Sequence, residues 1–188
     1  MDRMTRRTIP LTLALALAAI LAALLPSAPG ATATSATRES AVRWAISQVG
    51  TREIGTSNCS PKINRWERAM GLKVPPCRVW CGAFVHQAFL QAGVRLSARL
   101  IDPHRSYFDA VAGRRGLQRI APSQIRRGDI VFYKLRPGVL ASHMAIARGR
   151  PHDGKLDTVE GNVSNAASVE SRGVKYIVLA ARVASASG

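Results

Sequence analysis

Apolar residues in the first half of the chain recur at helical spacing. This spacing, together with capping residues and glycine stops, predicts helices over about residues 41–49, 60–71, 81–92 and 102–112. The second of them opens on Ser60-Pro61, the pattern of an N-cap followed by a first helical residue. The third, from Cys81 to Ala92, has polar side chains at few positions, so we expect it to be largely buried.

The pattern changes to short extended runs after Gly128. Apolar and β-branched stretches separated by Gly and Pro predict strands over residues 129–133, 143–147, 156–160 and 174–179. Helices therefore come first and strands follow. This order predicts an α+β fold in which a small antiparallel sheet packs against N-terminal helices.

The first 33 residues have the pattern of a secretory signal peptide. A basic start precedes an apolar run from Leu11 to Leu25, and Ala31-Thr32-Ala33 offers a small-residue cleavage site. The run is shorter than the roughly 20 residues that span a bilayer, so we expect secretion rather than a permanent membrane anchor. A retained anchor is the alternative. Residues 34–39 are expected to form a short tether, and residues 40–188 a single folded domain.

Three cysteines leave at least one thiol without a partner in the same chain. Cys59 and Cys77 lie in loop-forming segments, as structural cysteines often do. Cys81 lies at the expected start of the buried helix, where free N–H groups and a partial positive charge stabilise a thiolate and can receive an oxyanion. Cys81 is therefore a candidate nucleophile, and a packed core thiol is the alternative.

A thiolate nucleophile needs a proton-transferring partner, and His143 is the best candidate among the four histidines. Its strand has Ala145 and Ala147 on the same side, which leaves room for the cysteine-bearing helix. Glu160 and Asn162 end the next predicted strand and would face His143 if both are extended. Taken alone, these two residues favour a turn with a solvated carboxylate.

Four segments in this order resemble the CHAP family of cysteine- and histidine-dependent amidohydrolases and peptidases. They are Trp80-Cys-Gly-Ala-Phe-Val85, Arg127-Gly-Asp-Ile-Val-Phe132, Ser142-His-Met-Ala-Ile146 and Val159-Glu-Gly-Asn162. The resemblance covers about residues 40–180. It implies a papain-like α+β fold and cleavage of amide bonds in peptidoglycan, by amidase or endopeptidase action. The CHAP-like catalytic domain would then extend over residues 40–188.

The resemblance also implies a role for each candidate residue. Cys81 would be the nucleophile and His143 the general base, with Glu160 orienting the histidine and Asn162 as an accessory or alternative third member. The related NlpC-type peptidases typically use a second histidine in that third place, so CHAP fits better. No cofactor is implied. Some CHAP members bind calcium through aspartates near the N-terminus, but residues 51–64 contain none, so we expect no metal.

With Cys81 as the nucleophile, Cys59 and Cys77 remain as a pair, and export permits a disulfide between them. Such a bridge would close a loop of about 19 residues and contribute about 3 kcal/mol to stability.

The chain is strongly basic, with a formal net charge of +16. Residues 1–33 hold three arginines and one aspartate, so the remaining 155 residues keep 24 basic and 10 acidic residues, a net charge of +14. The basic residues are scattered rather than gathered in a stripe with aromatics, and export argues against nucleic acid as a partner. We expect a secreted monomer that meets anionic cell-wall polymers and peptidoglycan stem or cross-bridge peptides.

Two other functions remain open from the sequence. One is a CHAP-like, basic wall-binding or interaction protein without hydrolysis, in which Cys81 is only a packed thiol. The other is an exported effector that uses the same residues on a different amide or in a transferase reaction.

Overall fold

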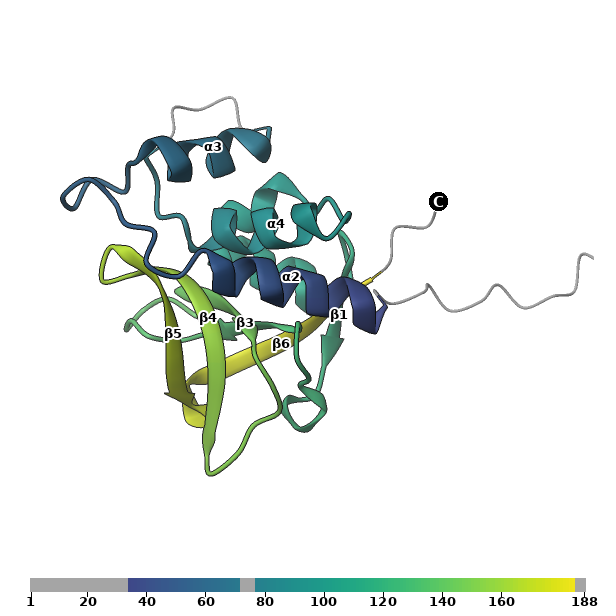
Figure 1. Ribbon diagram of the computed structural model, residues 1–188. Coiled ribbons are helices and arrows are strands. Elements are labelled where there is room, and N and C mark those ends of the chain that lie inside the picture. The colour runs from purple at the N-terminus through teal and green to yellow at the C-terminus, as the bar shows by residue number, and fades with distance from the viewer. Residues whose placement is uncertain (1–33, 72–76, 185–188) are drawn as a thin grey trace, which may run out of the picture.

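The computed structural model describes residues 34–71 and 77–184 (Figure 1). The expected signal peptide, residues 1–33, lies outside the described residues. The helices are α2 (Ser35–Ser47), α3 (Pro61–Ala69), α4 (Cys81–Gln91) and α5 (Pro103–Val111), close to the predicted ranges. Within the described ranges, no helix combines the length and the hydropathy that a membrane crossing needs.

The expected tether at residues 34–39 is instead mostly helical. Thr34 is the N-cap of α2, and its hydroxyl oxygen accepts a hydrogen bond from the backbone N–H of Thr37 at 3.2 Å. Glu39, in the second turn, pairs with Arg127 through two hydrogen bonds of 2.5 and 3.1 Å. These contacts attach residues 34–39 to the domain, although the polar composition of this segment alone suggests a free linker.

Six strands form one antiparallel sheet in the order β1-β6-β2-β3-β4-β5. They are β1 (Leu117–Ile120), β2 (Ile130–Tyr133), β3 (His143–Ala147), β4 (Lys155–Val163), β5 (Ala166–Gly173) and β6 (Ile177–Val183). Of three short 3-10 helices, η2 (Ala98–Ile101) lies between α4 and α5, η3 (Pro122–Gln124) connects β1 to β2, and η4 (Val174–Tyr176) connects β5 to β6. The α+β class with an antiparallel sheet is confirmed.

Two strands were not predicted, and a third is shifted. β1 has only four residues, and β5 is rich in Ser, Glu and Arg. β5 is held in the sheet by pairing with β4 along nearly the whole length of β4. This is a tertiary effect, and the intrinsic strand propensity of the residues in β5 does not predict it. The strand expected at 174–179 begins as η4 and becomes β6 only at Ile177.

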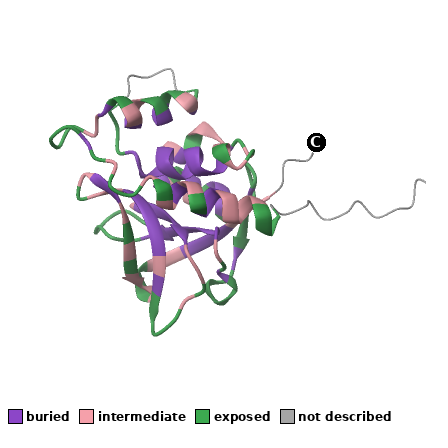
Figure 2. Cartoon of the chain, viewed as in Figure 1, coloured by how far each residue is buried: buried purple, intermediate pink, exposed green. Residues whose placement is uncertain are grey.

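Helix α4 lies at the centre of the larger core. Every residue from Cys81 to Phe89 is buried, and Figure 2 shows the helix as an almost continuous buried ribbon between the sheet and the other helices. On the sheet side, Met144 and Ile146 of β3 and Val159 of β4 belong to the same apolar cluster as α4. The helix that begins at Cys81 is therefore buried against the sheet, as the sequence predicted.

The face of β3 that receives α4 is not the one that the sequence suggested. Ala145 and Ala147 belong to a second apolar cluster on the other face of the sheet, together with Val131, Tyr133 and Leu156. The small alanine side chains therefore accommodate side chains of neighbouring strands rather than the helix. His143 precedes them on that face, at the end of the strand where it can still reach the start of α4.

Gly82 allows a close approach between α4 and η2. A β-carbon at this position would lie 1.8 Å from the carbonyl oxygen of Leu100, a backbone atom that cannot move aside cheaply. We expect Gly82→Ala to lower the free energy of unfolding by about 2 kcal/mol, measured by urea denaturation. Gly149→Ala is the matched control, since a β-carbon there meets nothing within 4 Å. Equal stability of the two variants would contradict this packing.

Candidate active site

Cys81 is the first residue of α4, and its side chain is fully buried. It is the free cysteine among the three, all of which lie in the described ranges. Trp80 is the N-cap, and no side chain caps this end of the helix. The N–H groups of the first turn are thus left without a side-chain acceptor, and they can receive an oxyanion that forms beside the sulfur.

His143 and Glu160 meet across strands β3 and β4. The Nε2 atom of His143 lies 2.8 Å from Oε2 of Glu160, and both side chains are buried. The side chain of Cys81 also lies beside the imidazole of His143, close enough to raise its pKa. Because Nε2 is occupied by Glu160, Nδ1 is the ring nitrogen available to the sulfur. The three residues therefore form a chain from thiol to imidazole to carboxylate.

The charges in this chain follow from its hydrogen bonds. Burial lowers the pKa of His143, but hydrogen bonds to Cys81 and Glu160 and the negative charge of both raise it, with a net value of about 9. Burial raises the pKa of Glu160, but hydrogen bonds from His143 and Arg172 lower it to about 2. Near neutral pH the pair is an imidazolium and a carboxylate.

Arg172 and Thr158 hold the carboxylate of Glu160 in place. Arg172 of β5 donates to both carboxylate oxygens at 2.7 to 3.0 Å, and the Thr158 hydroxyl donates to Oε1 at 2.5 Å. The sequence reasoning missed both residues. A buried carboxylate requires a cationic partner, so the sequence did indicate that Glu160 needs one. This requirement alone does not identify Arg172, because Arg172 lies on an unpredicted strand of an arginine-rich chain.

Asn162 does not contact His143 and Glu160 in the way that the sequence suggested. Its φ is 64°, and the strand register shifts between Glu160 and Val163, so the alternation that would put Asn162 beside Glu160 is broken. With its oxygen toward Trp80, the side chain accepts from the Trp80 backbone N–H at 3.1 Å and donates to Glu53 at 3.2 Å. Asn162 therefore braces the residue before Cys81, while it also lines a small cavity with His143.

Glu53 is another residue that fixes the approach to Cys81. Its buried carboxylate accepts hydrogen bonds from the Trp80 indole Nε1–H and from the backbone N–H of Asn58, both at 2.8 Å. The contacts tie the loop before α3 to the N-cap of α4. Glu53 binds the indole of Trp80 and Asn162 binds its backbone N–H, so the two residues together hold Trp80 in place.

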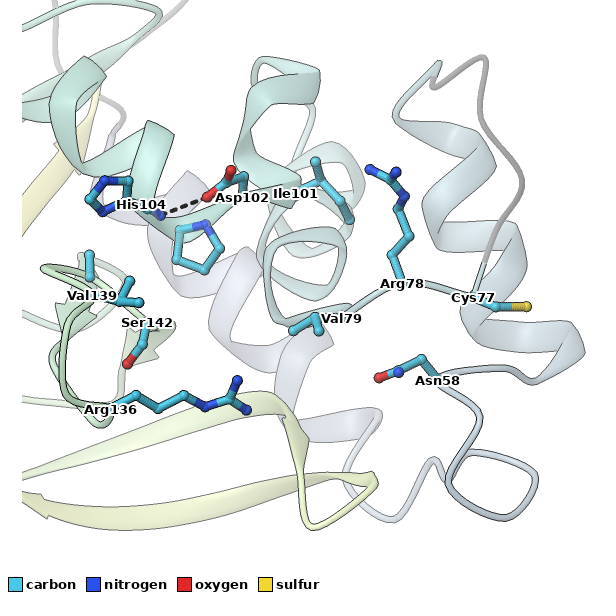
Figure 3. Close-up of a pocket in the computed structure, with 12 residues that line it drawn as sticks. Asn58, Cys77, Arg78, Val79, Ile101, Asp102, His104, Arg136, Val139 and Ser142 are labelled. Atoms are coloured by element: carbon cyan, nitrogen blue, oxygen red, sulfur yellow. Dashed lines mark hydrogen bonds between the residues drawn. The ribbon is translucent and has the colours of Figure 1, made fainter.

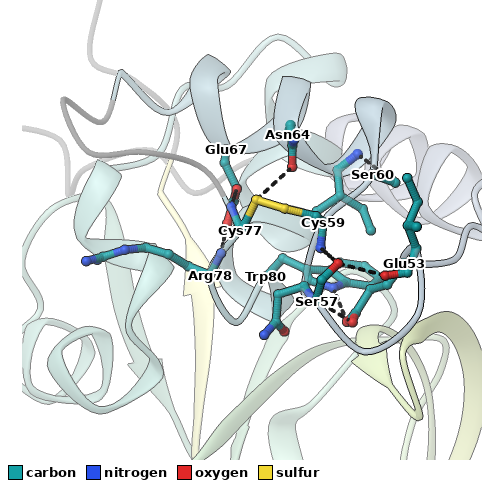
Figure 4. Close-up of a disulfide and its surroundings, with 12 residues drawn as sticks. Glu53, Ser57, Cys59, Ser60, Asn64, Glu67, Cys77, Arg78 and Trp80 are labelled. Atoms are coloured by element: carbon teal, nitrogen blue, oxygen red, sulfur yellow. Dashed lines mark hydrogen bonds between the residues drawn. A yellow bond between two sulfur atoms is a disulfide. The ribbon is translucent and has the colours of Figure 1, made fainter.

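A disulfide between Cys59 and Cys77 joins the loop before α3 to the segment that leads into α4 (Figure 4). The buried carboxylate of Glu67 accepts hydrogen bonds from the backbone N–H groups of Cys77 and Arg78, at 2.6 and 2.9 Å. The disulfide and Glu67 thus both anchor a segment that ends at the N-cap of α4. The expected bridge is present, with Cys81 as the free thiol.

A cavity of about 540 Å³ lies beside these residues (Figure 3). Val79, two positions before Cys81, and Ser142, which precedes His143, both line it. A smaller cavity of about 210 Å³ is lined by His143 and Asn162 themselves. A substrate can therefore lie against the start of α4 and the start of β3 at once.

Within the described ranges, neither His86 nor His152 belongs to a further centre of this kind. His86 is buried in α4, and burial lowers its pKa to about 4. His152 is half-exposed and pairs with Asp153 and Asp157 in a turn. Over residues 34–71 and 77–184, no group of three or more His, Cys, Asp and Glu side chains is arranged to hold a metal ion.

The raised pKa of His143 predicts a specific pH profile. The imidazolium persists up to about pH 9, so kcat/KM of the wild type should fall as pH rises through about 9. Glu160→Gln removes the negative charge that helps to hold this proton and leaves Arg172 uncompensated, so the alkaline fall should move to lower pH. We also expect kcat to fall about tenfold or more, because the imidazole loses its orienting partner.

Asp153→Asn is the control for this profile, since it also neutralises a carboxylate, but the Asp153 side chain is 97% exposed and pairs with His152, away from Glu160 and Arg172. An alkaline limit that is unchanged in Glu160→Gln would contradict the assignment of the pKa shift to Glu160.

Comparison with known proteins adds evidence on the fold. The sequence matches no protein-family model and no curated protein. The structure is similar to a crystal structure from Staphylococcus aureus that is described as similar to a lipoprotein of the NLP/P60 family, with a TM-score of 0.50 and 14% sequence identity. The similarity covers 88% of this chain and 48% of that chain, so this chain spans about half the length of that protein. The fold is therefore papain-like and related to that of NLP/P60 proteins.

Proposed function

We propose that this protein is a secreted cysteine hydrolase that cleaves amide bonds in peptidoglycan, as an amidase or an endopeptidase. The observation that carries this proposal is the placement of Cys81, His143 and Glu160 at the uncapped N-terminus of a buried helix, with His143 hydrogen-bonded to Glu160 and next to Cys81. This is the arrangement that nucleophilic catalysis by a thiolate requires. The NLP/P60-related fold is compatible with a cell-wall peptidase.

The reaction would proceed through a thioester. The Cys81 thiolate attacks the amide carbonyl carbon, and the first-turn N–H groups of α4 receive the oxyanion. His143 gives its proton to the leaving nitrogen as the C–N bond breaks. Neutral His143 then takes a proton from water, whose oxygen attacks the thioester carbonyl. The C–S bond breaks, which releases a carboxylic acid and restores the thiolate and the imidazolium, and the acid then loses its proton to solvent.

The finer assignment to a CHAP-type rather than an NlpC-type enzyme rests on the third residue. Glu160 occupies the position behind His143, where NlpC-type peptidases typically place a second histidine. Arg172 gives this carboxylate a counter-ion, so that it stays ionised in a buried place. We propose that Glu160 orients His143, and that Asn162 acts on the backbone of Trp80 instead.

The positive charge fits an exported enzyme that works on an anionic wall. Long-range attraction would concentrate a protein of net charge +14 on wall polymers and raise its local concentration near the substrate. Co-sedimentation with purified walls should therefore weaken as salt is raised from about 50 mM to about 500 mM, over which the Debye length shortens severalfold. Binding that does not change with salt would contradict this electrostatic role.

Mass spectrometry of fragments released from defined peptidoglycan tests the proposed function. The expected result is a set of soluble fragments with one new carboxyl and one new amine end for each cleaved bond, which also identifies the bond. Salt-dependent wall binding with no fragment released would instead support a wall-binding protein without hydrolysis. Cleavage of other amides alone would support an exported effector.

A further inference from the structure

Three neighbouring cavities share lining residues on both sides of His143, and we call them together the long groove. The cavity of about 540 Å³ shares Arg136 and Ser142 with the cavity of about 210 Å³ that His143 lines. The latter shares Leu135 and Arg172 with a third cavity of about 400 Å³. The long groove therefore extends on both sides of His143, which suits a substrate that continues in both directions from the scissile amide.

The long groove carries unpaired positive charge. Within the described ranges, the side chains of Arg78, Lys134 and Arg136 line it and form no ion pair or hydrogen bond. Asp102 is the one carboxylate among the lining residues. It is already engaged, because it caps α5 and pairs with Arg105 at 3.4 Å. The groove thus presents cationic groups that no acidic side chain of the groove neutralises.

Apolar side chains accompany these charges. Val79, Val139 and Leu140 are each more than a third exposed, and Val79 and Val139 line the cavity of about 540 Å³ together with Ile101. An exposed apolar wall favours an organic ligand with aliphatic parts. A surface for an inorganic or phosphate polyanion would need the charges but not this wall.

Arg136 is the cation best placed to act close to the reaction. It lies in the loop between β2 and β3 and lines both cavities that meet at Ser142, the residue before His143. Figure 3 shows its side chain extended along the groove from Ser142 toward Asn58. A guanidinium has a planar pair of donors that matches a carboxylate, and an exposed arginine without a partner is free to bind one.

We propose that the long groove binds an acidic peptide and that Arg136 holds a free carboxylate of the substrate next to the scissile amide. This inference rests on the proposed function and specifies its substrate: peptides in which that carboxyl is free should be preferred over peptides in which it is amidated. Replacing a carboxylate by a carboxamide removes the charge and turns one acceptor oxygen into a donor, while it leaves the shape nearly unchanged. The discrimination therefore reports on recognition of the carboxylate.

The test uses two synthetic peptidoglycan stem peptides that differ only in the α-carboxyl group of the glutamyl residue, free in one and amidated in the other. The wild type should cleave the free acid with a kcat/KM about tenfold higher, mainly through KM, as expected for loss of one charge-assisted contact. Arg136→Gln should lose this preference. Arg150→Gln, at an exposed position outside the groove, should keep it.

Binding of the same two peptides to Cys81→Ala, measured by calorimetry, provides a readout that does not need turnover. A dissociation constant about tenfold lower for the free acid supports the proposal. Equal affinity, equal cleavage by the wild type, or a preference that survives in Arg136→Gln would overturn it while leaving the proposed hydrolysis intact. Preferential binding of the acid without cleavage of any peptide would support the carboxylate site and contradict the proposed hydrolysis.

Discussion

His143→Ala should lower kcat for amide cleavage by about three orders of magnitude, because in the proposed mechanism the general acid and base steps both pass through this imidazole. Without it, the leaving nitrogen beside Cys81 has no imidazolium to protonate it. The fold should survive, since Glu160 keeps its hydrogen bonds from Arg172 and Thr158. The rate of fragment release from defined peptidoglycan is the measurement.

His152→Ala is the matched control for this substitution. His152 is half-exposed and interacts only with Asp153 and Asp157 in a turn, so its loss should leave kcat unchanged. Circular dichroism and the unfolding midpoint of both variants should resemble the wild type. If folded His143→Ala kept more than about a tenth of the wild-type kcat, His143 would not be the acid and base.

Loss of the disulfide between Cys59 and Cys77 should lower both stability and activity. The bridge closes a loop of about 19 residues, so the double variant Cys59→Ser/Cys77→Ser should lose about 3 kcal/mol of unfolding free energy. For a domain of this size, that corresponds to a midpoint about 10 °C lower. Activity should fall as well, because the bridge anchors the segment that enters α4 at Trp80.

Reductant gives the control for the disulfide prediction. It should lower the thermal midpoint of the wild type toward that of the double variant and leave the double variant unchanged. The free thiol of Cys81 is present in both, so any effect common to the two proteins reports on Cys81 rather than on the bridge. A wild-type midpoint that does not respond to complete reduction would contradict a stabilising role.

The sequence was most informative where a local signal marked a boundary. The N-cap and proline at Ser60-Pro61 begin α3, and the apolar run after Trp80 begins α4 with Cys81 as its first residue. His143 begins β3 as predicted. With Cys81 singled out as the free thiol, the two loop cysteines were left to pair, and they do. These features depend on neighbours in the chain, which is why a single sequence reveals them.

The sequence was least informative where the outcome depended on distant pairing. Arg172 reaches Glu160 only because β5 pairs with β4, and β5 has no apolar alternation that marks it as a strand. The irregular backbone at Asn162 likewise reflects its surroundings: a β-carbon at Gly161 would lie 2.5 Å from Phe84. The chain leaves regular strand geometry where α4 packs against it, and Asn162 turns toward Trp80 as a result.

The most direct test of the account compares the rate at which the wild type and Cys81→Ala release fragments from the same defined peptidoglycan. The account predicts release by the wild type and a rate at least about 10³-fold lower for folded Cys81→Ala, since no other nucleophile lies at the start of α4. Fragment release by Cys81→Ala at the wild-type rate would contradict catalysis by this cysteine.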